Sequence, residues 1–545
     1  MLHPSAPEHP PGDELAPGAG VGRFHHVAGG RIVDPDGHPV LLRGVGLGNW
    51  LLPEGYMWGF GASAASPRQI EAAVEEMLGA VDAERFWRGF RDRFVAEADV
   101  VAIAQAGFDH VRLPVNWRVL MTSAGGFLEA GFELVDRLIG WCREQGLTVL
   151  IDLHGAPGGQ TGTNIDDSAG RPELFMDPRN EELAVALWTE IARRYRDEPA
   201  VLGYDLLNEP LPDQWQHRYS GELVALYRRL TAAVRSQDPD HLIMYEGTHW
   251  ATNWDIFTEV WDPNSVLQFH KYWSPVDRAG IERFLAVGRR LGLPVYMGEG
   301  GENTPEWIAA ATQLYEDCGV GWNFWTWKKI ETRTSPLSVR APDGWDRVLA
   351  RVEGTAGRLD RDDAVRIFDE LLENMTAARC TRHPAVLHAL FRLAPLTLPA
   401  YGFTFRGAGV SYGTAAATPH PRLRADDAVT LRRRDGAPDL DFGHPARVGR
   451  EGDVVADLGA GDWLAFDVEL VPGEWTIAVI GEHGPGAPAV TAAGSRVTLT
   501  SRDGGAADQV WTGTYTVLER GRPEIRVTAG PDGLVLTRLR VTAAT

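Results

Sequence analysis

Hydrophobic and polar positions repeat as strand, loop and helix across residues 23–397. Short apolar runs alternate with amphipathic stretches such as 132–145 and 180–196, whose apolar residues recur at helical spacing. Such an alternation is typical of a parallel sheet that is buried on both faces. Eight units of this kind in about 370 residues predict the α/β fold class, as a (β/α)8 TIM barrel. The candidate strands are 41–45, 110–114, 148–154, 201–207, 241–246, 266–270, 294–300 and 321–327.

The pattern changes after the barrel, in residues 398–545. Helical spacing disappears there, and apolar residues alternate strictly with polar ones, as in 464–470. This alternation predicts an all-β, jelly-roll-like sandwich domain. Residues 1–22 are rich in Pro and Gly and predict a disordered lead-in.

Composition narrows the class of ligand. The net charge of −21 argues against a nucleic acid or an anionic membrane surface as partner and favours a neutral ligand. Three scattered cysteines form neither a disulfide framework nor a zinc site, so no metal or cofactor is expected. The chain begins with no basic segment followed by an apolar one, so it resembles a cytoplasmic protein, although a trimmed secreted protein would look the same. The oligomeric state stays open.

Two glutamates stand at the ends of predicted strands. The run 201–207 ends in Asn208-Glu209-Pro210, and a later strand ends in Gly298-Glu299. Proline cannot continue a hydrogen-bonded ladder, so the strand stops and the glutamate stands at the open end of the barrel. Two such carboxyl groups in one barrel are typical of a retaining glycoside hydrolase, in which they lie about 5–5.5 Å apart.

Further polar residues follow the other strands in a fixed order. Arg112, His154, Asn208-Glu209, His270 with Tyr272, Glu299 and Trp327 succeed one another along the chain. This ordered set resembles glycoside hydrolase family 5 over nearly all of the barrel. The resemblance implies a (β/α)8 fold, a neutral carbohydrate substrate and two catalytic glutamates.

The resemblance assigns a role to each position. Glu299 is the expected nucleophile and Glu209 the acid and base. Arg112 is expected to keep the pKa of Glu299 low, and Tyr272 to donate a hydrogen bond to it. Asn208 is expected to bind the 2-hydroxyl of the sugar. His154 and His270 either bind substrate or orient the two glutamates. Trp327 is expected to stack on the sugar, with Trp325 as the alternative.

Segments 43–54, 67–99 and 152–160 are similar to the exo-β-1,3-glucanase branch of that family. In that branch a glutamate at the position of Glu54 binds the terminal sugar and closes the cleft. The loop 161–167 is longer here, so endo and exo action both stay open.

The C-terminal domain carries Gly461-Asp462-Trp463-Leu464 and Gly473-Glu474-Trp475. These motifs resemble carbohydrate-binding modules of families 6 and 35. The alternative is a sandwich that only buttresses the barrel, with both tryptophans in its core.

The leading hypothesis is a retaining β-glycosidase for β-glucosidic linkages that acts on chain ends or short oligosaccharides. A second is a β-glycosidase for glucosides or disaccharide conjugates of small aglycones. A third is a non-enzymatic carbohydrate-binding protein on a degenerate barrel, against which the presence of both Glu209 and Glu299 argues.

Overall fold

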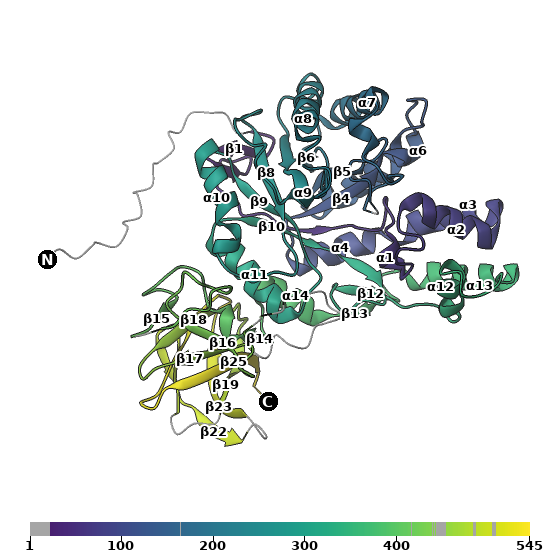
Figure 1. Cartoon of the computed structure of the whole chain (residues 1–545). Coiled ribbons are helices and arrows are strands. Elements are labelled where there is room, and N and C mark those ends of the chain that lie inside the picture. The colour runs from purple at the N-terminus through teal and green to yellow at the C-terminus, as the bar shows by residue number, and fades with distance from the viewer. Residues whose placement is uncertain are drawn as a thin grey trace.

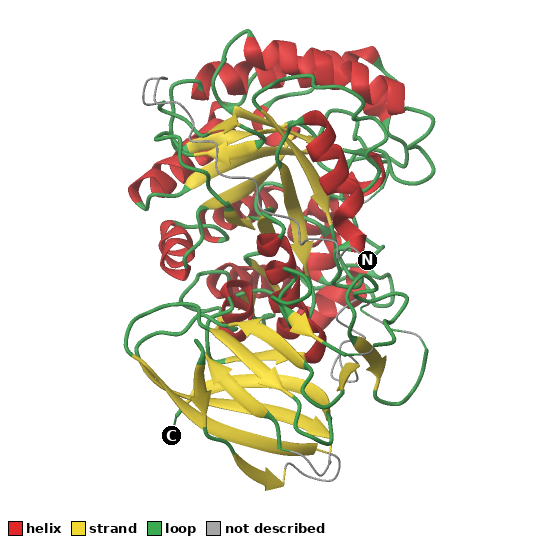
Figure 2. Cartoon of the chain, turned by 90° about the vertical axis from the view of Figure 1, so that its left-hand side faces the viewer, coloured by secondary structure: helices red, strands yellow, loops and turns green. Residues whose placement is uncertain are grey.

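The computed structural model describes residues 22–163, 165–415, 417–438, 440, 442, 454–482, 487–503 and 508–544. The lead-in expected over residues 1–22 lies outside the described residues, apart from Gly22. A barrel surrounded by helices lies above a domain built of strands (Figures 1 and 2).

The barrel closes through eight parallel strands, as the sequence predicts. Their order around the barrel is β10-β3-β4-β5-β6-β7-β8-β9, and β10 pairs with β3 through Asn323 and Gly44. All eight candidate strands are present. They are β3 (Arg43–Gly46), β4 (His110–Asn116), β5 (Thr148–Gly155), β6 (Val201–Asp205), β7 (Leu242–Glu246), β8 (Ser265–His270), β9 (Val295–Gly301) and β10 (Gly321–Trp325).

The outer helices bury one apolar stripe, except α11 (Pro305–Asp317), which is buried on all sides over residues 307–315. In α6 (Glu129–Glu144) the buried side chains include Phe132, Val135, Leu138 and Cys142, which share one face. The remaining barrel helices are α4 (Glu97–Ala106), α7 (Pro178–Tyr195), α8 (Ser220–Arg235), α10 (Ala279–Leu291) and α11 (Pro305–Asp317). Within the described ranges, no helix has both the length and the apolar character needed to cross a lipid bilayer.

Most of the segment 67–99 forms a side lobe. Helices α2 (Pro67–Leu78) and α3 (Ala80–Arg93) follow β3 and pack against α13 (Arg361–Asn374). Aromatic rings fill the lobe: Phe86 meets Phe368 edge-on at 5.0 Å, and Trp58 stacks on Phe90 at 5.4 Å. Short helices α1 (Gly55–Trp58) and α12 (Trp345–Val352) complete it (Figure 1).

The interior of the barrel changes from apolar to polar along the strands. Near the strand starts, the side chains of Leu42, Leu150, Leu242 and Tyr296 form an apolar cluster with β2 (Arg31–Val33), the partner of β1 (His26–Ala28). Side chains two residues further along a strand face the same side. At the strand ends these inward positions are polar and fully buried, as in Arg112, Asp152, Asp205, Glu246 and Gln268.

The C-terminal domain consists of two antiparallel sheets, as predicted. One has the order β16-β17-β25-β19-β23-β22 with β14 on β25, and the other the order β15-β18-β24-β20-β21. The first contains β14 (Leu396–Pro399), β16 (Thr430–Arg433), β17 (Val454–Leu458), β19 (Gly473–Glu482), β22 (Thr500–Asp503), β23 (Asp508–Val517) and β25 (Leu534–Ala543). The second contains β15 (Tyr412–Gly413), β18 (Trp463–Asp467), β20 (Ala489–Ala492), β21 (Ser495–Val497) and β24 (Glu524–Thr528).

A cluster of charges joins the two domains. Glu316, near the end of α11, accepts hydrogen bonds from Arg43 of β3 at 2.9 Å and from Arg522 of the sandwich at 3.0 Å. It also pairs with Arg392, which directly follows α14 (Pro384–Phe391). Burial opposes ionisation of Glu316, but the three guanidinium groups outweigh it and lower its pKa to about 2. One carboxylate thus ties barrel, connecting helix and sandwich together.

Replacing this carboxylate is expected to weaken the whole assembly. The depressed pKa of Glu316 stabilises the fold at pH values above 4.5, the ordinary pKa of a glutamate. This stabilisation is lost as the pH falls toward 2. Glu316→Gln should therefore lower the free energy of unfolding by about 3 kcal/mol at pH 7. Urea unfolding between pH 7 and pH 3.5 measures the difference from wild type, which should shrink below pH 4.5.

The matched control is Glu282→Gln on α10. Glu282 also pairs with arginines, Arg278 and Arg289, but the pair is exposed to solvent. Its loss should cost at most about 1 kcal/mol. Equal effects of the two substitutions would contradict a special role of Glu316.

Candidate active site

Most of the side chains singled out in the sequence meet at the open end of the barrel. This end is formed by the carboxyl ends of the parallel strands, and the residues come from five of the eight. The residues that meet there are Arg112 on β4, His154 on β5, Asn208 and Glu209 after β6, His270 at the end of β8, Tyr272 two residues later, and Glu299 on β9. All are buried except Tyr272, which is half-buried.

Glu209 stands on a strained turn. Its φ is +43°, in the left-handed region that residues other than glycine rarely adopt. The backbone N–H of Glu209 donates to Glu246 Oε2 at 2.7 Å, and its side-chain Oε1 lies 2.7 Å from His270 Nδ1. Both ends of the residue are therefore held, which gives its carboxyl group one defined direction.

Glu246, at the end of β7, is a residue that sequence reasoning missed. Besides the Glu209 backbone, it accepts hydrogen bonds from Gln268 at 2.6 Å and from Arg112 at 3.2 Å, and it lies 3.2 Å from His270 Nε2. A signal was present, because the candidate strand 241–246 ends in this glutamate. Gly298 leaves room for this network: a Cβ there would lie 2.0 Å from the side chain of Gln268.

Arg112 is fully buried and links the polar strand ends. Its guanidinium donates to Glu299 Oε2 at 2.8 Å and to Asn208 Oδ1 at 2.8 Å. It also binds Asp205 at 2.9 Å and lies 3.1 Å from Asp152. Asp152 and Asp205 were not singled out in the sequence, since they lie within otherwise apolar strands.

Glu299 is held from two sides. Tyr272 donates its hydroxyl to Oε1 at 2.7 Å, while Arg112 binds Oε2. Burial raises the pKa of Glu299. His270 and Arg112 lower this pKa, while Glu209 raises it further. The expectation that Arg112 keeps this pKa low is therefore corrected: its effect has the expected sign, but burial is stronger.

The two histidines carry different charges. Burial works against protonation of His270, but Glu246, Glu299 and Glu209 outweigh it and raise the pKa of His270 well above its ordinary value. His270 is thus a cation that orients Glu209. Burial lowers the pKa of His154 to about 4, so this ring is neutral.

The neutral His154 ring supports Asn208. Its Nδ1 lies 2.7 Å from Asp152 Oδ2, and its Nε2 lies 3.3 Å from Asn208 Nδ2. Burial raises the pKa of Asp152 to about 8, against the effect of Arg112. The side-chain amide of Asn208 is thereby fixed between Arg112 and His154, with one N–H left to donate.

The structure contradicts the prediction for Trp327. Its indole Nε1 donates to Asp99 Oδ1 of α4 at 2.9 Å, so the ring packs between the barrel and this helix. Trp325 takes the place at the barrel opening instead. It stacks on His154 with ring centroids 5.5 Å apart and donates to the Tyr56 hydroxyl at 2.7 Å.

Glu54 lies in the same opening, near Glu299. It is buried, and its neighbours include two residues that were not anticipated, Glu302 after β9 and Lys329 of β11 (Lys328–Ile330). Lys329 forms an ion pair with Glu302.

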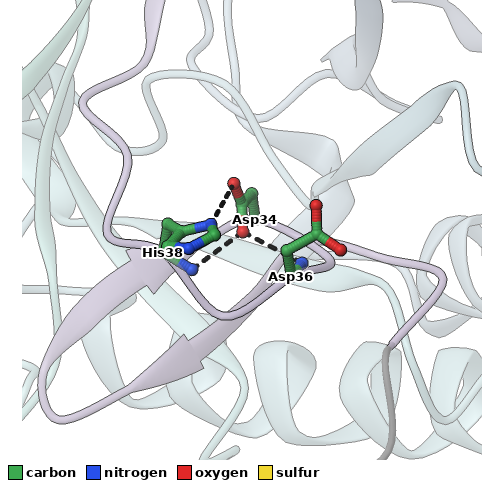
Figure 3. A group of neighbouring side chains, drawn as sticks. All are labelled: Asp34, Asp36 and His38. Carbon is green, nitrogen blue, oxygen red and sulfur yellow. Dashed lines mark hydrogen bonds and ion pairs between the residues drawn. The ribbon is translucent and has the colours of Figure 1, made fainter. Parts of the chain in front are cut away.

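Two groups of side chains in the described residues have the spacing of metal ligands. One, Glu209 with His270 and Glu299, belongs to the network above. The other, Asp34 with Asp36 and His38, is a turn between β2 and β3 (Figure 3). Asp34 Oδ1 accepts the backbone N–H groups of Asp36 at 3.0 Å and of His38 at 2.8 Å, which explains the cluster as a capped turn.

The charge of His270 is expected to depend on Glu246. Removing that carboxylate in Glu246→Gln takes away a cause that raises the pKa of His270, so the pKa should fall. Histidine NMR titration measures it, with the His270 resonance assigned from a His270→Gln variant. Glu282→Gln, far from the site, should leave the titration unchanged. An unaltered His270 pKa in Glu246→Gln would contradict this account.

Comparison with known proteins locates a family match. Residues 76–330 match the family model described as cellulase (glycosyl hydrolase family 5). A β-xylosidase of Phanerodontia chrysosporium is 33% identical over 252 residues, which cover 45% of this chain and 51% of that protein. A probable glucan 1,3-beta-glucosidase A of Aspergillus clavatus is 31% identical over 241 residues, 43% of this chain and 55% of that protein. The chain thus spans about half the length of these curated relatives.

The solved structures that match this chain have low sequence identity to it. An endogalactoceramidase is 17% identical with a TM-score of 0.47, and the match covers 93% of this chain and 99% of that one. Thermotoga maritima Cel5A in complex with cellobiose is 20% identical with a TM-score of 0.39, over 58% of this chain and 97% of that one. The match to the family model covers the part of the chain that carries Arg112, Glu209 and Glu299.

Proposed function

We propose that the protein is a retaining β-glycosidase that hydrolyses β-glucosidic linkages by double displacement, at chain ends or in short oligosaccharides. One observation carries the proposal: a carboxylate oxygen of Glu209 and one of Glu299 lie within 4.8 Å of each other. Retaining enzymes hold their carboxyl groups about 5–5.5 Å apart, whereas inverting enzymes need about 6.5–9.5 Å to admit a water molecule.

The first step is attack by Glu299 on the anomeric carbon. Tyr272 and Arg112 hold one carboxylate oxygen each, which fixes the direction of attack. Glu209 gives its proton to the leaving oxygen as the glycosidic bond breaks. The product of this step is a sugar esterified to Glu299 and a free aglycone.

The second step reverses these roles. Glu209, now ionised, removes a proton from water, which attacks the anomeric carbon and releases Glu299. The cationic His270, 2.7 Å from Glu209, stabilises the ionised form in this interval. The free N–H of the Asn208 amide is placed to bind the 2-hydroxyl of the sugar.

The substrate is a neutral glycan. Relatives are named for xylosidic and 1,3-glucosidic activity and as endoglucanases, all of which concern uncharged sugars. The net charge of −21 agrees with such a partner. The presence of both glutamates at the required spacing argues against a binding protein without catalytic activity.

A second candidate function is a β-glycosidase for conjugates with small aromatic or lipid aglycones. Trp273 favours it, because 43% of this large ring is exposed beside Tyr272, with the centroids 5.4 Å apart. An aromatic surface of this kind binds a flat or apolar aglycone by stacking.

We further propose that the sandwich buttresses the barrel rather than binding sugar. The ring of Trp463 is covered by the Arg526 guanidinium at 3.8 Å, and Trp475 is buried with its Nε1 bonded to Val471 O at 2.9 Å. Trp475 is therefore a core residue, and one face of the Trp463 ring is covered. Glu316 ties the domain to the barrel, as does a hydrogen bond from Phe405 N to Asp317 at 2.7 Å.

Removal of the nucleophile is expected to stop turnover. Glu299→Ala should lower kcat below about 1% of wild type on aryl β-glucosides, because no covalent intermediate can form. The measurement is release of 4-nitrophenol, with circular dichroism to verify the fold. Glu282→Ala on α10 serves as the control and should keep full activity. Activity of several per cent in Glu299→Ala would refute the assignment.

Removal of the acid and base should depend on the leaving group. Glu209→Ala is expected to lose about 100-fold or more on an alkyl glucoside but far less in the first step on a dinitrophenyl glucoside, which needs little protonation. Added azide should then give a β-glucosyl azide, since it needs no base. Equal losses on both substrates, without azide product, would count against Glu209.

A further inference from the structure

A second cavity lies outside the barrel opening, between the side lobe and α6 (Figure 1). Its volume is about 760 Å³, within the range of sites that bind small molecules. The residues assigned above to catalysis and sugar binding do not line it. This space, here called the side cavity, has a polar and aromatic lining that includes Glu71 and Glu75 of α2, Trp87 and Arg91 of α3, Arg118 of α5 (Trp117–Leu120) and Glu133 of α6.

Arg91 brings a guanidinium group without a partner to this cavity. Its side chain is half-buried, yet it makes no hydrogen bond or ion pair with any residue that the structure describes. Burial lowers the pKa of Arg91, Glu71 acts against this effect, and the neighbouring Arg118 adds to it. A half-buried cation that gains no partner from the protein is unfavourable, and a ligand with acceptor oxygens would satisfy it.

Arg118 adds a second donor. Its Nε binds Asp167, and its Nη1 donates to Glu71 Oε2 at 3.0 Å. Its Nη2 is buried and has no partner in the described part of the chain. A buried polar atom in this state costs free energy unless a ligand or a water molecule binds it. Arg91 and Arg118 therefore offer unused N–H groups to one cavity.

Trp87 supplies a flat apolar surface beside these donors. Its ring packs edge-on against Phe86 at 5.3 Å and against Phe90 at 5.4 Å, so its position is fixed by the core of the side lobe. The residue is nevertheless only half-buried, and it lines the side cavity. An aromatic ring with a few placed polar groups around it is the usual lining of a site for a small organic ligand.

The acidic residues of the side cavity decide the charge of that ligand. The carboxylates of Glu75 and Glu133 line it as well, and neither has a hydrogen bond or an ion pair within the described ranges. An anion would be repelled by these carboxylates, and a cation by Arg91. A hydroxyl group both donates and accepts hydrogen bonds. A neutral sugar can therefore satisfy the guanidinium and the carboxylate groups together.

We propose that the side cavity is a second glycan-binding site, separate from the catalytic opening, which holds one or two sugars of a neutral glycan. Trp87 stacks on a sugar ring, while Arg91 and Arg118 donate hydrogen bonds to its hydroxyls. The choice of a glycan rests on the proposed glycosidase function, but binding here needs neither Glu209 nor Glu299. Such a site tethers a glycan chain and raises its concentration near the barrel opening.

Affinity electrophoresis of the full-length Glu299→Ala variant tests the proposal. The probes are hydroxyethyl cellulose, laminarin and arabinoxylan, each cast into a native gel. At least one should slow the protein relative to a gel without glycan. A further substitution, Arg91→Met, removes the donors but keeps the length of the side chain. It should raise the apparent Kd for that glycan by about 10-fold. No retardation by any probe, or an unchanged Kd in Arg91→Met, would overturn the second site.

The matched control is Arg85→Met on the same helix. Arg85 does not line the side cavity and instead donates to Asp369 of α13 at 2.7 Å. Its loss should leave the apparent Kd unchanged. Urea unfolding should show Arg91→Met to be at least as stable as its parent, because the guanidinium has no partner to lose. Weaker binding accompanied by a clear loss of stability would mean that Arg91 is structural, against the proposal.

Three further outcomes separate this site from the alternatives. Inorganic phosphate that raises the Tm of the wild type but not of Arg91→Met, without glycan binding, would show an anion site and overturn the proposal. Glycan binding that is lost in Trp463→Ala and kept in Arg91→Met would place the site on the sandwich instead. Binding that depends on Arg91, in a wild-type protein that hydrolyses no glycoside, would contradict the proposed function and leave the second site standing.

Discussion

The buried guanidinium of Arg112 is the constraint on which the candidate site depends. It lies within hydrogen-bonding distance of Asp152, Asp205, Glu246 and Glu299, from four different strands. Carboxyl groups this close cannot all ionise, and burial raises the pKa of Asp152 and of Asp205, while a buried cation without a partner is equally unfavourable. The four strand ends can therefore keep their carboxyl groups buried together only with Arg112, and Arg112 can be buried only beside them. The barrel supplies the required convergence, because parallel strands bring their polar ends to one side.

The same network positions the two carboxyl groups that carry the proposed chemistry. Glu246 binds Arg112 with one oxygen and the backbone of Glu209 with the other, so the strained turn at Glu209 is fixed to the charged centre. Arg112 binds Glu299 directly. The spacing of the two carboxyl groups thus follows from one shared set of hydrogen bonds. Rigidity of this kind keeps reacting groups in register without reorganisation during the reaction.

Much of this could be predicted from the sequence, because each strand is a local apolar run and its last polar residue is easily seen. Glu209 and Glu299 were found in this way, and the resemblance to the family added His270 and Tyr272. Glu246 was missed although it ends the candidate strand 241–246, because a local pattern does not tell which strand ends contact one another. The ion pair of Glu302 with Lys329 joins residues beyond the strand ends and has no such local mark. Trp325 and Trp327 share the same strand parity, yet the strand ends at Trp325. Beyond that point alternation no longer tells which way a side chain faces, and Trp327 turned out to bind Asp99.

The charges around the opening also bear on the transition state of the proposed reaction. Arg112 and His270 offset Glu246 and Glu299, and Lys329 offsets Glu302. The anomeric carbon becomes positively charged, like an oxocarbenium ion, as the glycosidic bond breaks. It would do so next to the carboxylate of Glu299, while the nearest fixed cations point their hydrogen bonds at carboxylates. The arrangement therefore stabilises the positive charge that develops in the transition state but does not stabilise the neutral substrate. This difference is the condition for catalysis by differential binding.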